Sequence, residues 1–326
     1  MSAGAGTLGY LGLALQNDLT GQANADSMHF LPFVSESLTE QIPRIDTQEL
    51  RHAHDEGYSH QGLRMVAGDI VLEPTPYSLA IAAYLTMGVL TTTSHASYFT
   101  HALQMRNDNL MAGAPLPPFT AVVGRDVSCA QAFWNMQATG FTVDVNQGEI
   151  AKLTMSVIGG AAIGDADLGT PSFNDVASSH MPWNVTSIQL SGSAALDFTQ
   201  LSIAVTNPIE ARPTVVTSDY ASVFKRSGFR QVRVNGTVDI SSLTHYDRLR
   251  TGAEHAFLMH MAPTANEYVT IGAPKLVYEA NPFNIGGPGA VAATVSLRAH
   301  PDASSGSLWC TARTLAEYEI GSGNVS

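Results

Sequence analysis

Alternation of hydrophobic and polar residues with a period of two dominates this chain. HFLPFVSESLTEQI at 29–42 is the longest such segment, and LRMVAGDIVLE at 63–73, TAVVGRDV at 120–127 and GFTVDV at 140–145 follow it. In EIAKLTMSVIG at 149–159, Ala, Leu, Met and Val alternate with Lys, Thr and Ser. Because successive side chains of a strand point to opposite faces, these segments predict β-strands, most of them with one buried face.

One segment of the first half has the features of a helix. PTPYSLAIAAYLTMG at 74–88 carries Thr75 as a candidate N-cap, Pro76 at the first helical position and Gly88 as a terminator. Its leucines and alanines recur with a helical period and form an apolar stripe. A single helix among many strands predicts a β-sandwich or barrel with the helix packed at its flank.

The second half repeats this order of elements. A long alternating segment at 188–213 parallels the first strand, and GFRQVRVNGTVDIS at 228–241 aligns with 62–74. SLTHYDRLRTGAE at 242–254 stands where the helix stood, and AVAATVSLRAH at 290–300 repeats the last strand. Four matched elements in one order predict an internal duplication.

The two halves meet at a segment rich in Gly, Ser, Asp and Pro, which predicts a linker over 161–184. We therefore expect a first domain over 1–160 that includes an N-terminal arm, and a second domain over 185–326. The length of 326 residues suits two domains, each large enough to bury a core.

Composition narrows the possible partners. The formal net charge is −12, which argues against direct nucleic-acid binding because phosphates are neutralised by Lys and Arg. Charged residues make up only 13% of the chain, so much of its surface is neutral and suits burial between subunits. The N-terminus has no basic region before its apolar stretch, and no segment approaches the ~18 apolar residues that span a bilayer. We expect no export signal, no membrane partner, and a protein that is made in the cytoplasm.

The sequence gives only weak evidence for metal binding, phosphate binding or catalysis. His52, His54 and His60 lie on one polar loop, but a metal site needs ligands that converge on one ion, so we expect no metal there. The glycines of NIGGPGA at 284–290 precede a predicted strand instead of a helix, which argues for a turn and against a phosphate site. Catalytic motifs such as Gly-x-Ser-x-Gly and His-Glu-x-x-His do not occur, so we expect no cofactor and no enzyme, although an unfamiliar enzyme stays open.

Two cysteines, Cys129 and Cys310, are far apart in the sequence and do not form a metal-binding spacing. Free buried thiols in a reducing compartment are the favoured interpretation, and a disulfide is the alternative.

Two long loops occupy the same position in each half, at 46–61 and at 214–227. Hairpin loops usually have two to five residues, so longer ones are expected to be functional or disordered. Both loops mix aromatic and charged residues in a way that suits contact with another protein. The candidate contact residues are Glu49, Leu50, Arg51 and Tyr58 in the first loop, and Tyr220, Phe224, Lys225 and Arg226 in the second.

In these segments the chain resembles the tail tube proteins of long-tailed phages, in particular the group with two tube domains in one chain. The resemblance rests on FLPFVSESL, on GLRMVAGDIVLE with the helix after it, on VDVNQGEIAKLTMSVIG, and on GFRQVRVNGTVDIS and YDRLRTG in the second half. It implies a mainly β fold of two sandwich or barrel domains, each with a flanking helix. It also implies that the inner sheets of several subunits join around a channel.

The resemblance further implies a homotrimeric ring with pseudo-sixfold symmetry, stacked into a virion tail tube through which DNA passes during ejection without specific binding. Tail terminator, tape measure and distal tail proteins are the implied partners. The long loops would then contact neighbouring rings, and an acidic lumen would let DNA slide. The candidate lumen residues are Glu36, Glu40, Asp69 and Glu73. The alternatives are a tube protein of a contractile tail or secretion system, and a virion-decorating or carbohydrate-binding β-sandwich.

Overall fold

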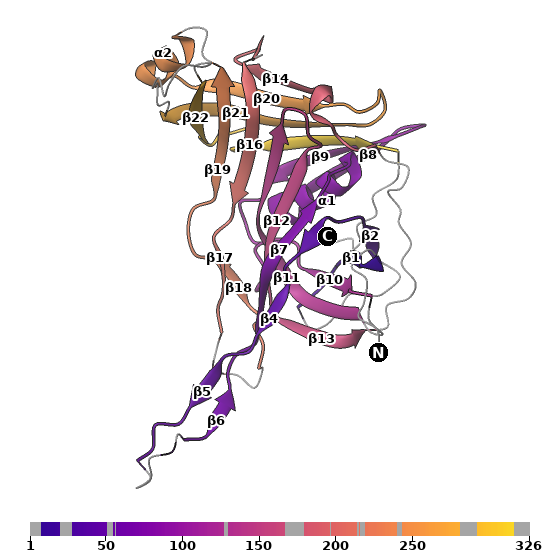
Figure 1. Cartoon of the computed structure of the whole chain (residues 1–326), viewed down its shortest axis with the longest axis vertical. Coiled ribbons are helices and arrows are strands. Elements are labelled where there is room, and N and C mark those ends of the chain that lie inside the picture. Colours follow the sequence, from indigo (N-terminus) through magenta and orange to yellow (C-terminus); the bar gives the residue numbers. More distant parts are fainter. Residues whose placement is uncertain are drawn as a thin grey trace.

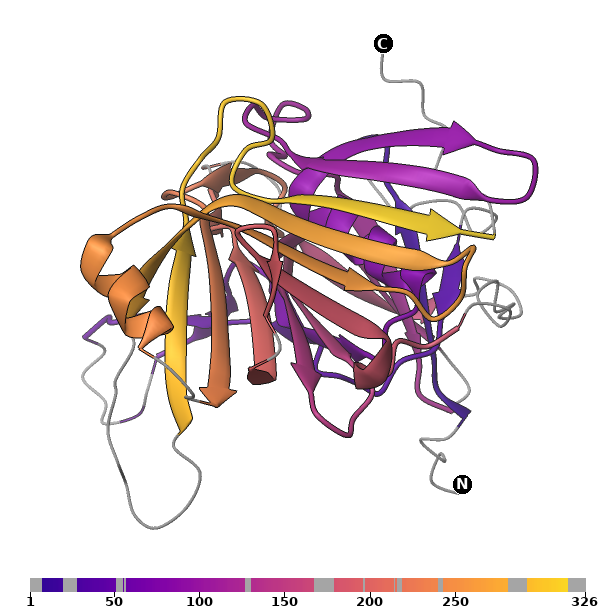
Figure 2. The same cartoon turned by 90° about the horizontal axis from the view of Figure 1, so that it is seen from above.

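The computed structural model describes residues 8–19, 28–50, 55, 57–126, 130–166, 179–195, 197–213, 215, 219–239, 243–280 and 292–315. These residues form antiparallel sheets with two α-helices, so the predicted mainly β fold is confirmed. One long central sheet is covered on one face by two smaller sheets (Figures 1 and 2).

The central sheet runs through both halves of the chain, and all its neighbouring strands are antiparallel. In spatial order it contains β3 (Ser35–Glu36) with β4 (Thr39–Gln41), β7 (Met65–Leu72), β12 (Lys152–Gly159), β11 (Ala130–Asn146), β16 (Phe198–Thr206), β19 (Gln231–Asp239), β22 (Ala292–Ala299) and β21 (Tyr268–Ala280). The two halves join where β11 pairs with β16, from Gly140 opposite Thr206 to Asn146 opposite Gln200.

Two covering sheets lie over the central one. The first contains β2 (His29–Leu31), β1 (Tyr10–Leu15), β10 (Phe119–Gly124), the first part of β11 and β13 (Ala161–Ala166). The second contains β15 (Ser193–Ala194), β14 (Thr186–Leu190), β20 (His255–Met261), the first part of β21, β23 (Trp309–Thr314), β9 (Phe99–Met105) and β8 (Gly88–Ser94). The long strands β11 and β21 thus belong to two layers each. Irregular register between Phe133 and Met136 of β11 and between Ala273 and Leu276 of β21 marks the change of layer.

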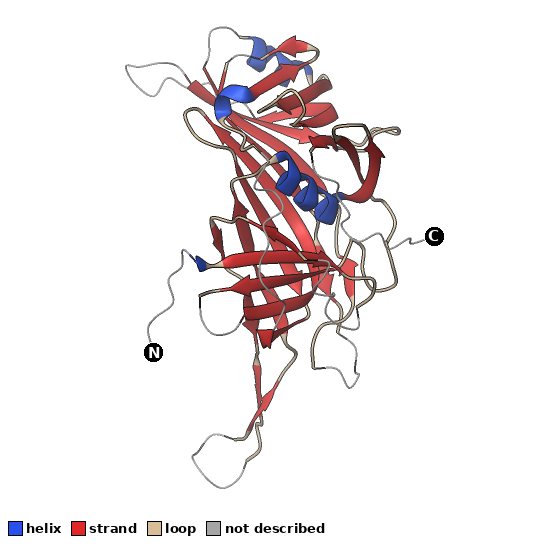
Figure 3. Cartoon of the chain, turned by 90° about the vertical axis from the view of Figure 1, so that its right-hand side faces the viewer, coloured by secondary structure: helices blue, strands red, loops and turns tan. Residues whose placement is uncertain are grey.

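The helix α1 (Pro76–Met87) forms as the sequence predicts. Thr75 and Ser78 make a capping box, and Gly88 ends the helix with a φ of 88°. Tyr84 is the one residue of α1 that is not buried. The helix lies between the central sheet and the second cover, and contacts β9, β11 and β23 (Figures 2 and 3). The predicted flanking helix is therefore an element of the core, because the β8–β9 hairpin and the last strand close over its outer side.

The second helix, α2 (Thr244–Thr251), also lies where the sequence predicts, and Gly252 ends it with a φ of 62°. His245 is its one buried residue, and its ring bonds the Tyr278 hydroxyl at 2.7 Å and an Asp197 carboxylate oxygen at 2.6 Å. The helix sits at one end of the molecule (Figure 1). A polar side chain network, instead of an apolar stripe, attaches it.

The remaining elements are two hairpins and a short turn of 3₁₀-helix. These are β5 (Arg44–Asp46) with β6 (Ser59–Gln61), β17 (Ile209–Ala211) with β18 (Phe224–Arg226), and η3 (Trp183–Val185). The predicted strand at 29–42 is broken into β2, β3 and β4. Residues 161–166, placed in the linker by the sequence analysis, form β13 and pair with β11.

Candidate assembly surfaces

The open face of the central sheet, turned away from the covers, is lined mainly by small polar side chains. Ser156 donates to Asp69 Oδ1 at 2.6 Å, and Ser296 donates to Asn235 Oδ1 at 2.8 Å. Rows of directly opposite residues on this face cross the joint between the halves without a break. One row contains Val71, Thr154, Thr142, Ala204, Arg233, Arg298 and Val277.

Charges on this open face are largely balanced in the second half. Glu279 lies 2.8 Å from Arg233 and 3.7 Å from Arg298. In the first half, Asp144 stands opposite Lys152 in the register. These pairs therefore offset part of the negative charge on this face, and the acidic lumen stays a prediction.

The four candidate lumen residues divide between the two faces of the sheet. Asp69 is exposed on the open face, and Glu73 is exposed just after β7 ends. Glu36 stands opposite Ile70 and Glu40 opposite Val66, two residues that are fully buried on the covered face. Residues directly opposite in a sheet share a face.

Glu36 and Glu40 therefore point toward the covers, and the expectation that they share a face with Asp69 is wrong. Glu36, Leu38 and Glu40 are alternate positions of one extended segment and share its covered face, where Leu38 is 3% exposed. Both carboxylates find partners there: Glu36 lies 2.9 Å from Arg125, while Glu40 accepts from the Ala162 N–H at 3.2 Å. The strand's alternation, with these partners available, outweighs the preference of a carboxylate for solvent.

The β5–β6 hairpin, which we call the arm, projects away from the body (Figures 1 and 3). Its side chains include large apolar groups in solvent: Leu50 is fully exposed, Tyr58 is 69% exposed and Ile45 is 60% exposed. At the base of its tip, the Thr47 N–H donates to the Tyr58 carbonyl at 2.9 Å, and the Thr47 hydroxyl accepts from the Tyr58 N–H at 3.0 Å. Glu49 is exposed as well. Arg51, His52 and His54 lie outside the described residues.

The second loop differs from the first, although the sequence predicts the same contact role for both. Phe224 is 1% exposed and packs in a small core with Leu116, Ile209 and Ala221. Tyr220 forms a backbone bridge with Arg64 and contacts Trp134, and Arg226 donates to the Arg106 carbonyl at 3.2 Å.

The prediction that Phe224 is an exposed contact residue is therefore wrong, because its ring completes an apolar cluster under the loop. Tyr220 and Arg226 are engaged within the chain. Lys225 remains exposed, as expected.

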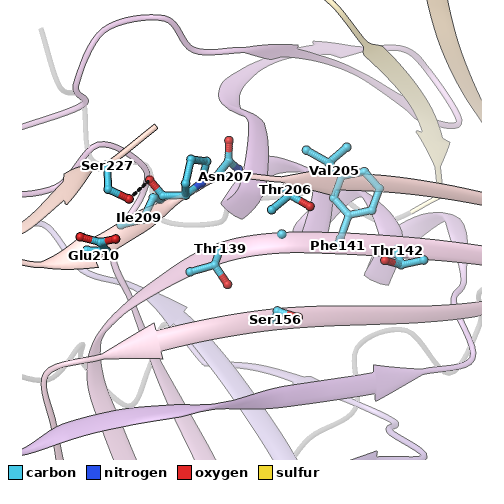
Figure 4. Close-up of a pocket in the computed structure, with 12 residues that line it drawn as sticks. Thr139, Phe141, Thr142, Ser156, Val205, Thr206, Asn207, Ile209, Glu210 and Ser227 are labelled. Carbon is cyan, nitrogen blue, oxygen red and sulfur yellow. Dashed lines mark hydrogen bonds between the residues drawn. The ribbon is translucent and has the colours of Figure 1, made fainter. Parts of the chain in front are cut away.

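A polar hollow of about 410 Å³ lies beside the joint of the two halves (Figure 4). Hydroxyl groups dominate its lining, and Ser227 donates to the Pro208 carbonyl at 3.3 Å. Glu210 is its one titratable side chain. This set lacks the paired acid and base, or nucleophile and base, that hydrolytic chemistry uses.

Cys310 is a buried free thiol whose pKa burial raises to about 12. Such a thiol is inert because the reactive species is the thiolate. Cys129 and the NIGGPGA segment lie outside the described residues. Within the described ranges, no cluster of His, Cys, Asp and Glu could hold a metal ion, and no helix is long and apolar enough to cross a membrane.

The sequence model of the family described as phage tail tube protein matches residues 6–299, which is most of the chain. The search of curated proteins finds no match.

Proposed function

Because the chain belongs to the phage tail tube protein family, we propose that three copies close into a ring and that such rings stack into the tube of the tail. The open face of the central sheet lines the channel, and the DNA genome passes along it during ejection. The protein is a structural subunit of the tail, and we propose that it carries out no chemistry. The observation that carries the proposal is the central sheet that continues from one half of the chain into the other.

Repetition of the strand order supports two tube domains per chain. In each half a long strand, β11 or β21, pairs along one edge with a strand that follows it, β12 or β22. The next strand, β13 or β23, returns to the first part of that same long strand. In each half, too, a strand, a hairpin, a second strand and a helix precede this set. Six such domains make a ring of three copies.

The joint between β11 and β16 provides a template for the joint between copies. It unites the two halves by seven antiparallel residue pairs, from Gly140 opposite Thr206 to Asn146 opposite Gln200. In the described part of the chain, the outer edge of β3 and β4 has no strand beside it. Closing the sheet into a continuous barrel would remove this free edge.

The open face suits a channel for DNA. Its arginines, Arg233 and Arg298, are paired with Glu279, and its other side chains are mostly neutral hydroxyl and amide groups. Unpaired cations would hold phosphates and slow the DNA. Asp69 and Glu73 add negative charge, so the face repels phosphate weakly and lets DNA slide.

Stacking is proposed to use the arm. Its exposed Leu50 and Tyr58 are large apolar groups that bury well in a protein interface. Glu49 belongs to the same proposed contact surface, and Lys225 adds a charge from the second loop. The ends of the tube would contact tail terminator and distal tail proteins, and the channel would hold the tape measure protein until ejection. Assembly would take place in the host cytoplasm.

Electron microscopy and sedimentation of the purified full chain test this function. The expected result is rings with three times the subunit mass and tubes that lengthen with concentration. The double variant Leu50→Asp, Tyr58→Asp should form rings but few tubes, because two carboxylates would have to be buried between rings. Lys152→Gln, on the channel face, serves as a matched control that stacks normally. A folded chain that stays monomeric at every concentration would refute the proposal.

A further inference from the structure

We infer that the outer edge of β3 and β4 receives a second copy of this chain, and that the Glu36–Arg125 pair covers this edge in the free subunit. The pair, which we call the latch, must open before the edge can accept a strand. This inference rests on the proposed function, since it assigns one side of the ring joint and a control on its formation.

The orientation of the backbone identifies the exposed edge. Ser37 donates its N–H to the Asp69 carbonyl of β7 at 3.0 Å. Ser37 and Leu38 lie between β3 and β4, and the register against β7 continues across them from Glu36 opposite Ile70 to Thr39 opposite Ala67. Neighbouring residues of an extended chain direct their backbone groups to opposite sides, so the N–H and C=O of Leu38 point away from β7. These are the groups that a further strand would bind.

In the free subunit both groups are already occupied by the latch. The Leu38 N–H donates to Glu36 Oε2 at 2.8 Å, and the Leu38 carbonyl accepts from Arg125 Nη2 at 3.3 Å. Charged side chains over an edge are a common protection against unwanted strand pairing. Here they bind the backbone of the edge itself.

Arg125 reaches the edge from the opposite layer, at the turn between β10 and β11. Its Nε and Nη2 bind the two oxygens of Glu36 at 2.9 and 3.2 Å, a bidentate arrangement. Its Nη1 donates to Gln131 at 2.5 Å. The Arg125 side chain is 41% exposed and the Glu36 side chain 10%, so an approaching strand can displace the latch from its Arg125 side.

The second half of the chain shows what fills an edge of this kind. The strand β16 also precedes a hairpin, and its odd-numbered residues direct their backbone toward β11. Asn207 donates to the Thr139 carbonyl at 2.6 Å, and the Thr199 carbonyl accepts from Gln147 at 3.2 Å. Leu201, Ile203 and Val205 are odd-numbered residues of β16 with buried side chains. Leu38 is buried as well, and its backbone also points to the edge that a further strand would join.

The outer edge of β3 and β4 therefore presents its backbone groups in the same way as the edge of β16 that pairs with β11. In the described part of the chain no strand completes it there. Since one copy supplies both a joining strand and a receiving edge, the occupant that fits is a second copy of the same chain.

The test compares assembly thresholds of the full-length protein. Removal of the latch by Glu36→Ala or Arg125→Ala should lower the concentration at which tubes appear by about tenfold, the range expected for loss of a charge-assisted pair. The two substitutions change the net charge in opposite directions, so a shared effect cannot come from reduced repulsion. Glu149→Ala removes a carboxylate that pairs with Lys152 at 3.8 Å, away from this edge, and should leave the threshold unchanged.

Sedimentation gives the threshold, and near-ultraviolet circular dichroism checks that each variant is folded. If Glu36→Ala does not fold, Glu36→Gln replaces it in the comparison. Its amide oxygen can still accept from the Leu38 N–H, but the bidentate pair with Arg125 is lost, so the threshold should again fall. Hydrogen exchange provides a second measurement: the amide of Leu38 should become strongly protected on assembly, whereas that of Ser37 is protected already.

Unchanged or higher thresholds in folded Glu36 and Arg125 variants, with normal tubes from the parent, would overturn the latch and leave the tube function intact. A parent protein that forms no rings or tubes would overturn both.

Discussion

Protonation of His101 should destabilise the protein in mild acid. His101 lies on β9, is fully buried, and bonds two threonine hydroxyls at 2.9 Å each: Thr92 through Nδ1 and Thr314 through Nε2. These bonds tie the β8–β9 hairpin to the last strand. Burial lowers the pKa of His101 from 6.5 to about 4, because a charged ring would lose its hydration.

The sign and size of the effect follow from linkage. Between pH 6.5 and 4 the unfolded chain binds a proton that the folded chain does not, so the free energy of unfolding falls as the pH falls. Lowering the pH from about 7.5 to about 5 should cost about 2 kcal/mol from this residue alone. Threonine hydroxyls can accept as well as donate, so the cost comes from lost hydration and not from lost hydrogen bonds.

Urea unfolding of the parent and of His101→Gln, at both pH values and below the assembly threshold, measures this term. The variant should be less stable at about pH 7.5 but should lose about 2 kcal/mol less than the parent on acidification. His60→Gln changes an exposed histidine and should keep the parental pH dependence. Equal losses in the parent and His101→Gln would refute the reasoning.

Three further substitutions test other parts of the structure. Leu79→Ala, in the helix that the second cover encloses, should cost about 2–5 kcal/mol in a thermal or urea unfolding measurement, and a cost below 1 kcal/mol would place the helix at an exposed flank. Phe224→Ala should cost about 3–5 kcal/mol in the same measurement, while Leu50→Ala should leave stability unchanged and act on assembly; the reverse pattern would contradict the assignment of the two loops. Gly272→Val should displace the Trp309 ring, which lies 2.3 Å from the position of an added Cβ, and a shifted tryptophan emission with about 1–3 kcal/mol of destabilisation is expected, whereas unchanged emission would argue against this packing.

Local features of the sequence were sufficient for most of the elements they marked. The alternation at 63–73, 149–159 and 290–300 produced β7, β12 and β22, and the cap residues around 74–88 placed α1 at the right position. Segments with weaker alternation, such as β8, β9 and β23, were not predicted. Their threonines and alanines are equally compatible with a loop. These segments form strands because β8 pairs with β9 and β9 with β23 over the helix.

The candidate contact residues were predicted unevenly for a related reason. The position and length of the loops were visible in the sequence, but whether a loop projects depends on what lies beneath it. Phe224 finds an apolar cluster that includes Leu116, a residue far away in the chain, whereas Leu50 finds none among the described residues. Arg125 carries no local signal at all, since its importance comes from the distant strand that it reaches.

By itself, the sequence determined the strand-rich character, the helix with its two ends and the small share of charged residues, because each depends on neighbouring residues or on composition. The tertiary structure alone decided that Glu36 and Glu40 face the covers, that α1 is enclosed, and that β11 joins the two halves. Side-chain direction in a strand follows from register, and register is fixed by the edges that meet across the fold. These strand pairings join residues far apart in the chain, so local sequence patterns do not predict them.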